Sequence, residues 1–182
     1  MTAQDRARWD DRYTQRAPAT SAEAVLPAVF APHAALFPTA GHALELACGR
    51  GQSAIWLARR GLAVKGYDIS SVAIAQAREL ADSCDVGERC RFAVVDLDAG
   101  LPNGPAAEAI LCHKFRDARL DGPVLDRLAP GGLLAISALS EVGAAAGPFR
   151  IKPGELERAF SALEVIAAGA ADGEAWLLGR RR

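Results

Sequence analysis

The sequence predicts an α/β fold: a Rossmann-like, doubly wound and mostly parallel sheet that ends in an antiparallel hairpin. From about residue 41 onward, short apolar segments alternate with helix-like segments, which is the pattern of a parallel sheet covered by helices on both faces. The stretch Ala43–Ser70 contains in order a strand, a glycine-bearing turn, a helix, a strand and an acidic residue, as in a βαβ unit. Asp172-Gly173 joins the last two apolar segments, and this dipeptide is typical of an antiparallel hairpin.

The composition fits one globular domain, which we assign to residues 1–182. The chain is 51% hydrophobic and 24% charged, with a formal net charge of −1 at pH 7. We therefore expect binding neither to nucleic acid nor to a membrane. The four cysteines form no Cys-x-x-Cys pair, so we expect no metal site and no disulfide. The polar N-terminus and the lack of a long apolar run lead us to expect a soluble, cytoplasmic protein.

Residues 1–38 are expected to form a helical segment that covers the main domain. Thr2–Arg16 is compatible with a helix that places Trp9 and Tyr13 on one face, four residues apart. These rings either dock the helix on the domain or form a lid over a bound cofactor. Ala17–Pro38 contains four prolines, so helices there must be short; Ser21 is a candidate cap for one that reaches Leu26.

Each part of the βαβ unit is indicated by particular residues. Ala43–Leu46 is an apolar strand, and Ala47–Gly51 is a turn whose glycines allow a sharp backbone path close to a ligand. Gln52–Arg60 is the helix, and its first N–H groups point toward that ligand. The next strand ends at Asp68, and Ser70 or Ser71 can cap a following helix that extends to about Ser83.

The second half of the chain continues the alternation. An acid closes the third strand at Asp96, and Pro153 suits the first turn of a helix. The expected strands are Cys90–Leu97, Ala109–His113, Leu133–Leu139, Leu163–Ala168 and Ala175–Leu178, and the expected helices are Asp121–Leu128 and Pro153–Phe160.

The glycine turn is compatible with two kinds of cofactor. Residues 49–54, GRGQSA, satisfy the G-x-G-x-x-A dinucleotide fingerprint, with Asp68 near the expected acidic position. However, Glu45 at the end of the first strand would crowd a pyrophosphate, whereas it suits a cationic ligand. Asp96 adds a further acid after the third strand. The residues therefore indicate a nucleotide-like cofactor and favour one with a positive charge.

This pattern resembles the class I S-adenosylmethionine (SAM)-dependent methyltransferases, whose first motif is an acid at a strand end followed by G-x-G-x-G. The motif stands here as residues 45–51, ELACGRG, with Ala47 in place of the first glycine. The resemblance extends from about residue 41 to the C-terminus and includes the turn Pro130-Gly131-Gly132 before the fifth strand. It implies the class I methyltransferase fold, SAM as the cofactor and methyl transfer as the reaction.

The resemblance also implies roles for three carboxylates. Glu45 would lie near the methionine end of SAM, Asp68 would accept hydrogen bonds from the ribose hydroxyls, and Asp96 would accept one from the adenine amino group. Hydrogen bonds to a carboxylate are stronger than those between neutral groups. The other residues of the implied SAM site are Ala47, Gly49 and Gly51 against the ligand, and Ile69 and Leu97 against the adenine.

Within this class, the chain resembles the small bacterial methyltransferases of the tellurite-resistance family. The segments that carry the resemblance are residues 9–13, WDDRY, and residues 148–156, PFRIKPGEL. By this resemblance Trp9 and Tyr13 lie near the SAM site, which favours the lid interpretation. Residues 112–116, after the fourth strand, and the short final hairpin depart from the relatives. Both regions tend to shape the acceptor pocket, so the resemblance leaves the acceptor open.

His113 is the candidate general base. It ends the fourth strand at the carboxyl edge of the sheet, where ligands bind in this fold class, and its ordinary pKa is near neutrality. An oxygen or nitrogen acceptor needs such a base, whereas a thiolate or a reduced chalcogen anion does not. The alternative is a strand-end histidine bonded to backbone. Lys114, Arg116 and Arg150 are candidates for steering an anionic acceptor, although surface solvation explains each nearly as well.

We therefore expect an enzyme that transfers the methyl group of SAM to a small-molecule acceptor by in-line displacement. The acceptor is a compound such as a thiol, a chalcogen oxyanion or a small metabolite. Two other classes remain open: an NAD(P)- or flavin-dependent oxidoreductase and a SAM-binding protein without catalysis. We expect a monomer or a homodimer.

Overall fold

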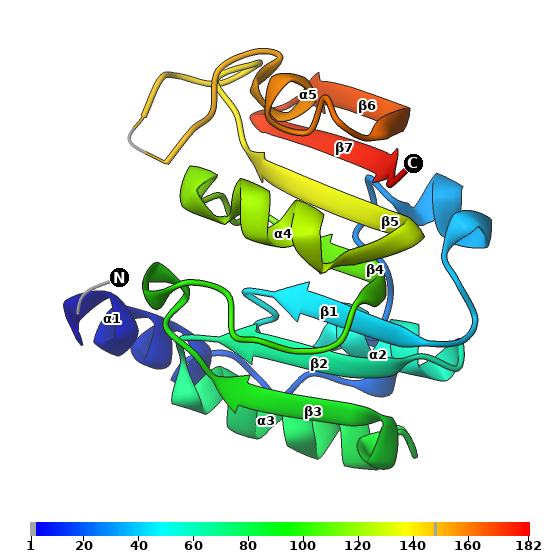
Figure 1. Cartoon of the computed structure of the whole chain (residues 1–182). Coiled ribbons are helices and arrows are strands. Elements are labelled where there is room, and N and C mark those ends of the chain that lie inside the picture. The colour runs from blue at the N-terminus through cyan, green and yellow to red at the C-terminus, as the bar shows by residue number, and fades with distance from the viewer. Residues whose placement is uncertain (1–2, 148) are drawn as a thin grey trace.

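The computed structural model describes residues 3–147 and 149–182, which form a seven-stranded sheet flanked by helices (Figure 1). The strand order is β3-β2-β1-β4-β5-β7-β6. Strands β1 to β5 are parallel, and β7 is antiparallel to both of its neighbours, so the predicted fold class is confirmed. The strands are β1 (His42–Leu46), β2 (Ala63–Asp68), β3 (Cys90–Val94), β4 (Ala107–Cys112), β5 (Leu128–Leu139), β6 (Glu164–Ala171) and β7 (Glu174–Arg180).

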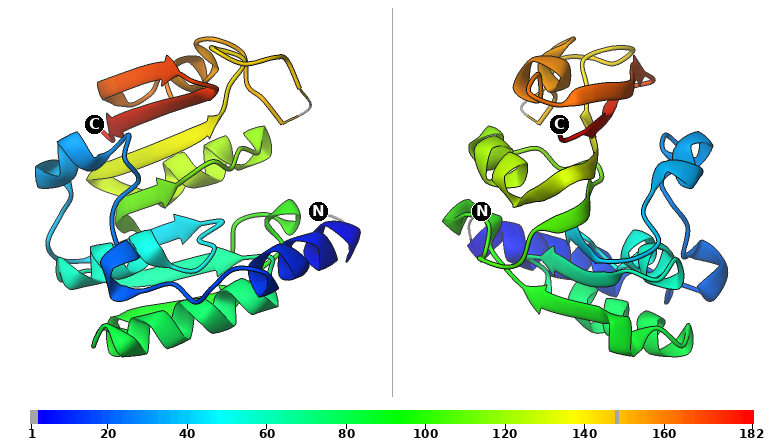
Figure 2. Two further views of the ribbon diagram at one scale, coloured as in Figure 1. Left: turned by 180° about the vertical axis from the view of Figure 1, so that it is seen from behind. Right: turned by 45° about the vertical axis from the view of Figure 1, so that its right-hand side comes forward.

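Two apolar layers hold the helices against the sheet. On one face α2 and α3 contribute residues such as Leu57 and Ile74 to a continuous buried cluster, and on the other α4 and α5 contribute Val124 and Leu156 (Figure 2). The segment that follows α1 extends the first layer toward β7, where the ring of Phe30 meets Trp176 edge-on at 6.2 Å. The helices are α1 (Ala3–Thr14), α2 (Gln52–Arg59), α3 (Ser71–Ser83), α4 (Asp121–Arg127) and α5 (Glu155–Ala159).

The proline-rich segment before β1 differs from its prediction. It contains 3₁₀ turns at Ser21–Glu23 and Ala31–Leu36 in place of a helix from Ser21 to Leu26. The cap of the first turn is Thr20, whose backbone N–H donates to Glu23 at 2.7 Å. Pro27, four residues after Glu23, lacks the N–H that would donate to the Glu23 carbonyl in a continued helix, so the turn does not extend.

Several element boundaries in the second half were also predicted wrongly; α5, for example, begins at Glu155 rather than at Pro153. β3 ends at Val94 rather than Leu97, because Asp96 accepts a hydrogen bond from the N–H of Asp98 and begins a 3₁₀ turn. β5 begins at Leu128, since the Pro-Gly-Gly turn lies within the strand as an irregularity in its pairing with β4. The final hairpin is longer than expected, with strands of eight and seven residues.

Thr2, where the first helix was predicted to begin, and Pro148, the first residue of the segment 148–156, lie outside the described residues. In the described part of the chain, no helix has both the length and the apolar character needed to cross a membrane.

Candidate active site

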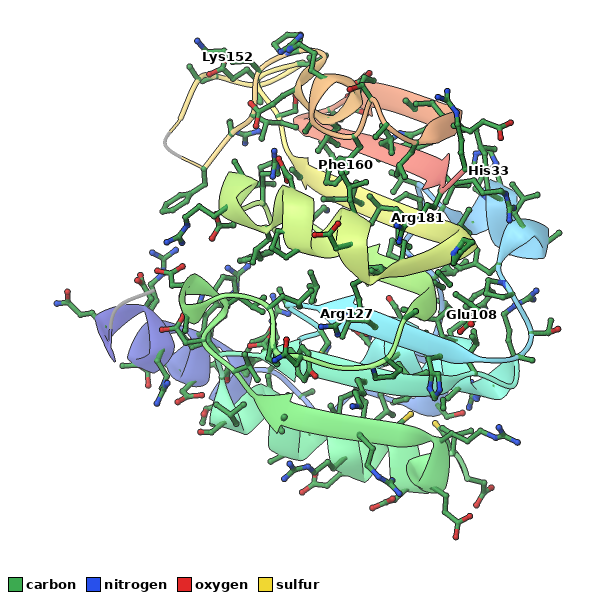
Figure 3. All side chains as sticks on the ribbon, viewed as in Figure 1. His33, Glu108, Arg127, Lys152, Phe160 and Arg181 are labelled. Atoms are coloured by element: carbon green, nitrogen blue, oxygen red, sulfur yellow. The ribbon has the colours of Figure 1, made fainter. Side chains whose placement is uncertain are left out.

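The parallel strands bring the three predicted carboxylates to one edge of the sheet. Glu45 is one residue from the end of β1, Asp68 is the last residue of β2, and Asp96 follows β3 by two residues. Because β1, β2 and β3 are parallel neighbours, their carboxyl ends lie side by side. Helix α1 lies along the same edge (Figure 1), whereas the labelled Glu108 and Arg181 mark the opposite edge (Figure 3). This edge of the sheet and the helix α1 that covers it together form a candidate cofactor site.

The turn between β1 and α2 places residues 47, 49 and 51 in the left-handed backbone region. Ala47 has φ 50°, Gly49 has φ 52° and Gly51 has φ 70°. A Cβ added to Gly49 would lie 2.7 Å from the hydroxyl of Tyr13, and one added to Gly51 would lie 2.7 Å from the Phe92 ring. Gly49 therefore permits close approach from α1, whereas Gly51 is required for packing within the protein.

Asp68 connects this turn to the start of α3. One carboxylate oxygen accepts from the N–H of Gly49 at 2.8 Å, and the other accepts from the N–H of Ser70 at 2.9 Å. The residue is 6% exposed, and burial raises its pKa, against which these hydrogen bonds act. The carboxylate is thus fixed in position at the end of β2.

Glu45 is a buried carboxylate beside the start of α2. It is 4% exposed, and burial raises its pKa to about 8, although the N–H of Ala54 and the hydroxyl of Ser53 act in the opposite direction. Its Oε2 is buried and has no hydrogen-bond partner among the described residues. Leaving a buried acceptor unused is costly. This atom is therefore suited to a donor or a positive charge supplied from outside the protein.

Helix α1 is held over the site by side-chain contacts. Trp9 and Tyr13 stack with ring centroids 5.9 Å apart. Asp10, which the sequence analysis did not single out, accepts from the hydroxyl of Ser70 at 2.5 Å and from the N–H of Val72 at 3.2 Å. Its position within the WDDRY segment was the available signal. These contacts place α1 against both the glycine turn and the start of α3.

Two apolar residues complete the predicted adenine region. Ile69 directly follows Asp68 and is 4% exposed, and Leu97 directly follows Asp96 and is 2% exposed. Both therefore lie at the same edge as the carboxylates. Their packing against adenine stays a prediction.

His113 lies beyond the end of β4 in a polar cluster. Its Nδ1 is 2.8 Å from the hydroxyl oxygen of Ser137 and 3.5 Å from Oε1 of Glu174. The other oxygen of Glu174 lies 3.2 Å from Nζ of Lys114. Burial lowers the pKa of His113, and the nearby Glu174 carboxylate opposes that effect. Sequence reasoning missed Ser137 and Glu174; the hairpin turn just before Glu174 was the signal that could have placed it at this edge.

Arg116 and Arg150 are occupied within the protein, which argues against their predicted role in steering an anion. Arg116 donates to both oxygens of Asp121, at 2.5 and 2.9 Å, and its guanidinium lies over the ring of Phe160, which Figure 3 labels. Arg150 donates to the carbonyl of Ser140 at 2.6 Å. We assign both to loop attachment. Lys114 is half-exposed and is the more accessible cation at this edge.

The site residues fit SAM better than a metal. Glu45 offers an unused buried oxygen, which a cationic ligand would satisfy. The space that a Cβ on Gly49 would enter is taken by the hydroxyl of Tyr13, so α1 rather than the ligand lies there. The described residues contain no group of His, Cys, Asp or Glu that could hold a metal ion. A cavity of about 300 Å³ does occur, but it lies beside α3 and β3, lined by residues such as Arg78 and Arg91. At the carboxyl edge, α1 covers the glycine turn instead.

Comparison with known proteins agrees with this geometry. Residues 43–132 match the family model of a methyltransferase domain. A search of curated protein sequences gives no significant match. The fold is similar to TehB from Haemophilus influenzae, with a TM-score of 0.76 and 16% identity over 96% of this chain and 67% of that one.

Two further solved structures share the fold along most of both chains. The SAH-bound magnesium protoporphyrin IX methyltransferase ChlM from Synechocystis PCC 6803, where SAH is S-adenosylhomocysteine, has a TM-score of 0.69 and 17% identity over 99% of this chain and 95% of that one. The CcbJ methyltransferase from Streptomyces caelestis has a TM-score of 0.69 and 16% identity over 94% and 95%. TehB supports the resemblance to the tellurite-resistance family at the level of the fold. The match to a methyltransferase domain over residues 43–132, together with the fold shared with solved methyltransferases, one of them SAH-bound, supports methyl transfer with SAM as the cofactor.

Proposed function

We propose that this enzyme methylates a small-molecule acceptor, within a single domain of residues 1–182 in which the N-terminal helix α1 covers the cofactor. The observation that carries the proposal is the carboxylate set at one sheet edge, in which Glu45 presents a buried oxygen without a partner. SAM supplies a methyl group already activated by the positive sulfonium. The protein therefore has to bind, orient and shield the reactants from water.

Each carboxylate has a distinct role in this proposal. Glu45 pairs with the positively charged methionine end of SAM, which satisfies Oε2. Asp68 keeps its bonds to Gly49 and Ser70 and accepts from the ribose hydroxyls with its remaining acceptor capacity. Asp96 accepts from the adenine amino group. This division matches one anionic group to each polar part of the ligand.

Ala47, Gly49 and Gly51 bring the turn's backbone against SAM, and α1 acts as the lid. Tyr13 already lies against Gly49, and Asp10 fastens the helix to the start of α3. Closing such a segment over the cofactor excludes water from the reacting groups. Trp9 and Tyr13 stack on each other within this lid.

Release of SAH tests the proposal. Purified protein is incubated with SAM and, in separate reactions, with 2-mercaptoethanol, catechol, iodide, selenite and tellurite. We expect acceptor-dependent release of SAH with at least one compound. If no acceptor causes release of SAH although SAH still binds, the result would instead support a SAM-binding protein without catalysis. The left-handed Ala47 favours this second candidate, since it strains the turn that approaches the ligand.

A further inference from the structure

Glu174 is a semi-buried carboxylate that reaches the candidate base from a distant part of the chain. Its side chain is 17% exposed and lies between two residues of the loop after β4. Oε1 lies 3.5 Å from Nδ1 of His113, and Oε2 lies 3.2 Å from Nζ of Lys114. Oε1 is fully buried and has no hydrogen bond in the described part of the chain. The nearby Nδ1 of His113 therefore accounts for the orientation of this oxygen.

The antiparallel strand makes this contact possible. Because β7 runs opposite to β5, its first residue lies at the carboxyl edge, where Glu174 pairs with Leu139. Ser137 is two residues before Leu139 on the same strand, so its side chain faces the same side of the sheet. A hairpin turn and two sheet neighbours thus bring Glu174 and Ser137 to the same nitrogen of His113.

We propose that Glu174 is a positioning residue that holds the proton of neutral His113 on Nδ1, leaving Nε2 to take a proton from a protic acceptor such as a hydroxyl or thiol compound. This inference rests on the proposed methyl transfer and narrows its substrate class. It distinguishes a neutral acceptor that must lose a proton from an anion that has none to lose.

The hydrogen-bond arrangement is compatible with this tautomer. Both contacts of the His113 ring with described residues are made by Nδ1. Ser137 already accepts from the N–H of Lys114 at 3.1 Å and has a second lone pair for Nδ1–H. A carboxylate beside Nδ1 favours the proton there, which makes Nε2 the acceptor.

The charges around His113 suit a base at neutral pH. Burial is the largest influence and lowers its pKa, Glu174 raises the pKa, and Lys114 lowers it again. A histidine with a lowered pKa is neutral at pH 7 and can accept a proton. The imidazolium that then forms is stabilised by the adjacent carboxylate.

In this methyl transfer each electron pair and the acceptor's proton have a defined destination. A lone pair on the acceptor's oxygen or sulfur forms the bond to the methyl carbon, while the carbon–sulfur bond of the sulfonium breaks and leaves its electrons on sulfur. The acceptor's proton moves to Nε2 of His113. The imidazolium returns that proton to solvent after the products leave.

The first test measures the ring directly and needs no acceptor. The sequence contains three histidines, so nitrogen NMR of the full chain resolves His113 by comparison with a His113→Asn variant. We expect the Nδ1–H tautomer in the wild type. In Glu174→Gln we expect the pKa of His113 to fall by about one unit and the tautomer preference to weaken. Glu174→Asp should restore part of both effects, and it provides a second variant if Glu174→Gln does not fold.

Glu164→Gln is the matched control, since this exposed glutamate lies in the same hairpin but pairs in register with Arg180, at the far end of β7. It should leave the His113 signals unchanged. A His113 pKa and tautomer that are identical in wild type and Glu174→Gln would overturn the inference.

The second test compares acceptors. With catechol or 2-mercaptoethanol, Glu174→Gln should reduce SAH release about tenfold and change the pH profile, whereas any release with iodide should be unaffected. An equal loss with iodide and catechol would contradict the inference. Calorimetry with SAH separates failure of the proposed function from failure of the role of Glu174. A wild type that binds no SAH refutes the proposed function. Intact SAH binding, with His113 signals that do not change in Glu174→Gln, refutes only the role of Glu174.

Discussion

Replacing Glu45 by glutamine should stabilise the ligand-free protein at high pH and weaken its affinity for SAM. The substitution keeps the shape of the side chain and an oxygen that can accept from Ser53 and Ala54, but it removes the ionisable group. In the folded protein the Glu45 carboxyl is stable when neutral and unfavourable when charged, as expected for a group whose charge is compensated only by a bound cationic ligand. The two effects therefore have opposite signs.

The magnitude follows from the pKa of Glu45. Burial raises it from 4.5 to about 8, so the folded state holds this proton more tightly than the unfolded state does. Stability from this group is fully present below pH 4.5 and is lost as the pH rises through 8. At 1.36 kcal/mol per pKa unit, the loss is about 3 kcal/mol by pH 7 and about 5 kcal/mol above pH 8. Glu45→Gln should escape this loss.

Denaturant unfolding of both proteins at several pH values between 5 and 9 measures the effect. We expect the free energies of unfolding to diverge with pH, the variant becoming the more stable protein by several kcal/mol at pH 9. Calorimetry at pH 7 should show weaker binding of SAM to the variant, and release of close to one proton when the wild type binds SAM. Parallel pH profiles for the two proteins would refute the reasoning about Glu45.

Four further substitutions test the edge and its lid. Asp68→Asn removes the charge from two hydrogen bonds to the turn and from the predicted ribose contacts, so affinity for SAH should fall at least about tenfold in calorimetry; unchanged affinity would exclude Asp68 from the site. Gly49→Ala places a Cβ 2.7 Å from the Tyr13 hydroxyl in a left-handed conformation and should cost about 1–2 kcal/mol or more in denaturant unfolding. Tyr13→Phe should recover part of that cost in the double variant, and strict additivity would show that the two residues do not interact. Asp10→Ala should speed amide exchange in α1 and weaken SAH binding, whereas unchanged exchange would show that Asp10 does not hold the helix.

The sequence predicted those parts of the fold that depend on local signals. The βαβ unit follows from the apolar strand before Ala47, the glycine turn and the acid at Asp68, and its helix and strands match the structure within one or two residues. Asp172-Gly173 likewise predicted the antiparallel pair, because a hairpin turn is a local feature. The position of His113 at the carboxyl edge followed from counting strands.

The remaining features depend on contacts between distant residues. Asp121 is only five residues from Arg116, but the sequence does not show that the two side chains pair, and Phe160, on which Arg116 packs, is distant in the chain. Asp10 and Glu174 likewise acquire their roles only when α1 reaches α3 and the start of β7 reaches the loop after β4. Such pairings are fixed by tertiary packing, which periodicity and turn residues do not encode.

Calorimetric titration of the purified protein with SAH and, separately, with NAD(H) tests the central claim most directly. The carboxylate edge built by Glu45, Asp68 and Asp96 predicts saturable binding of SAH and no binding of the dinucleotide, with the SAH signal weakened in Asp68→Asn. Binding of NAD(H) without SAH would contradict the account and identify the glycine turn as a dinucleotide site.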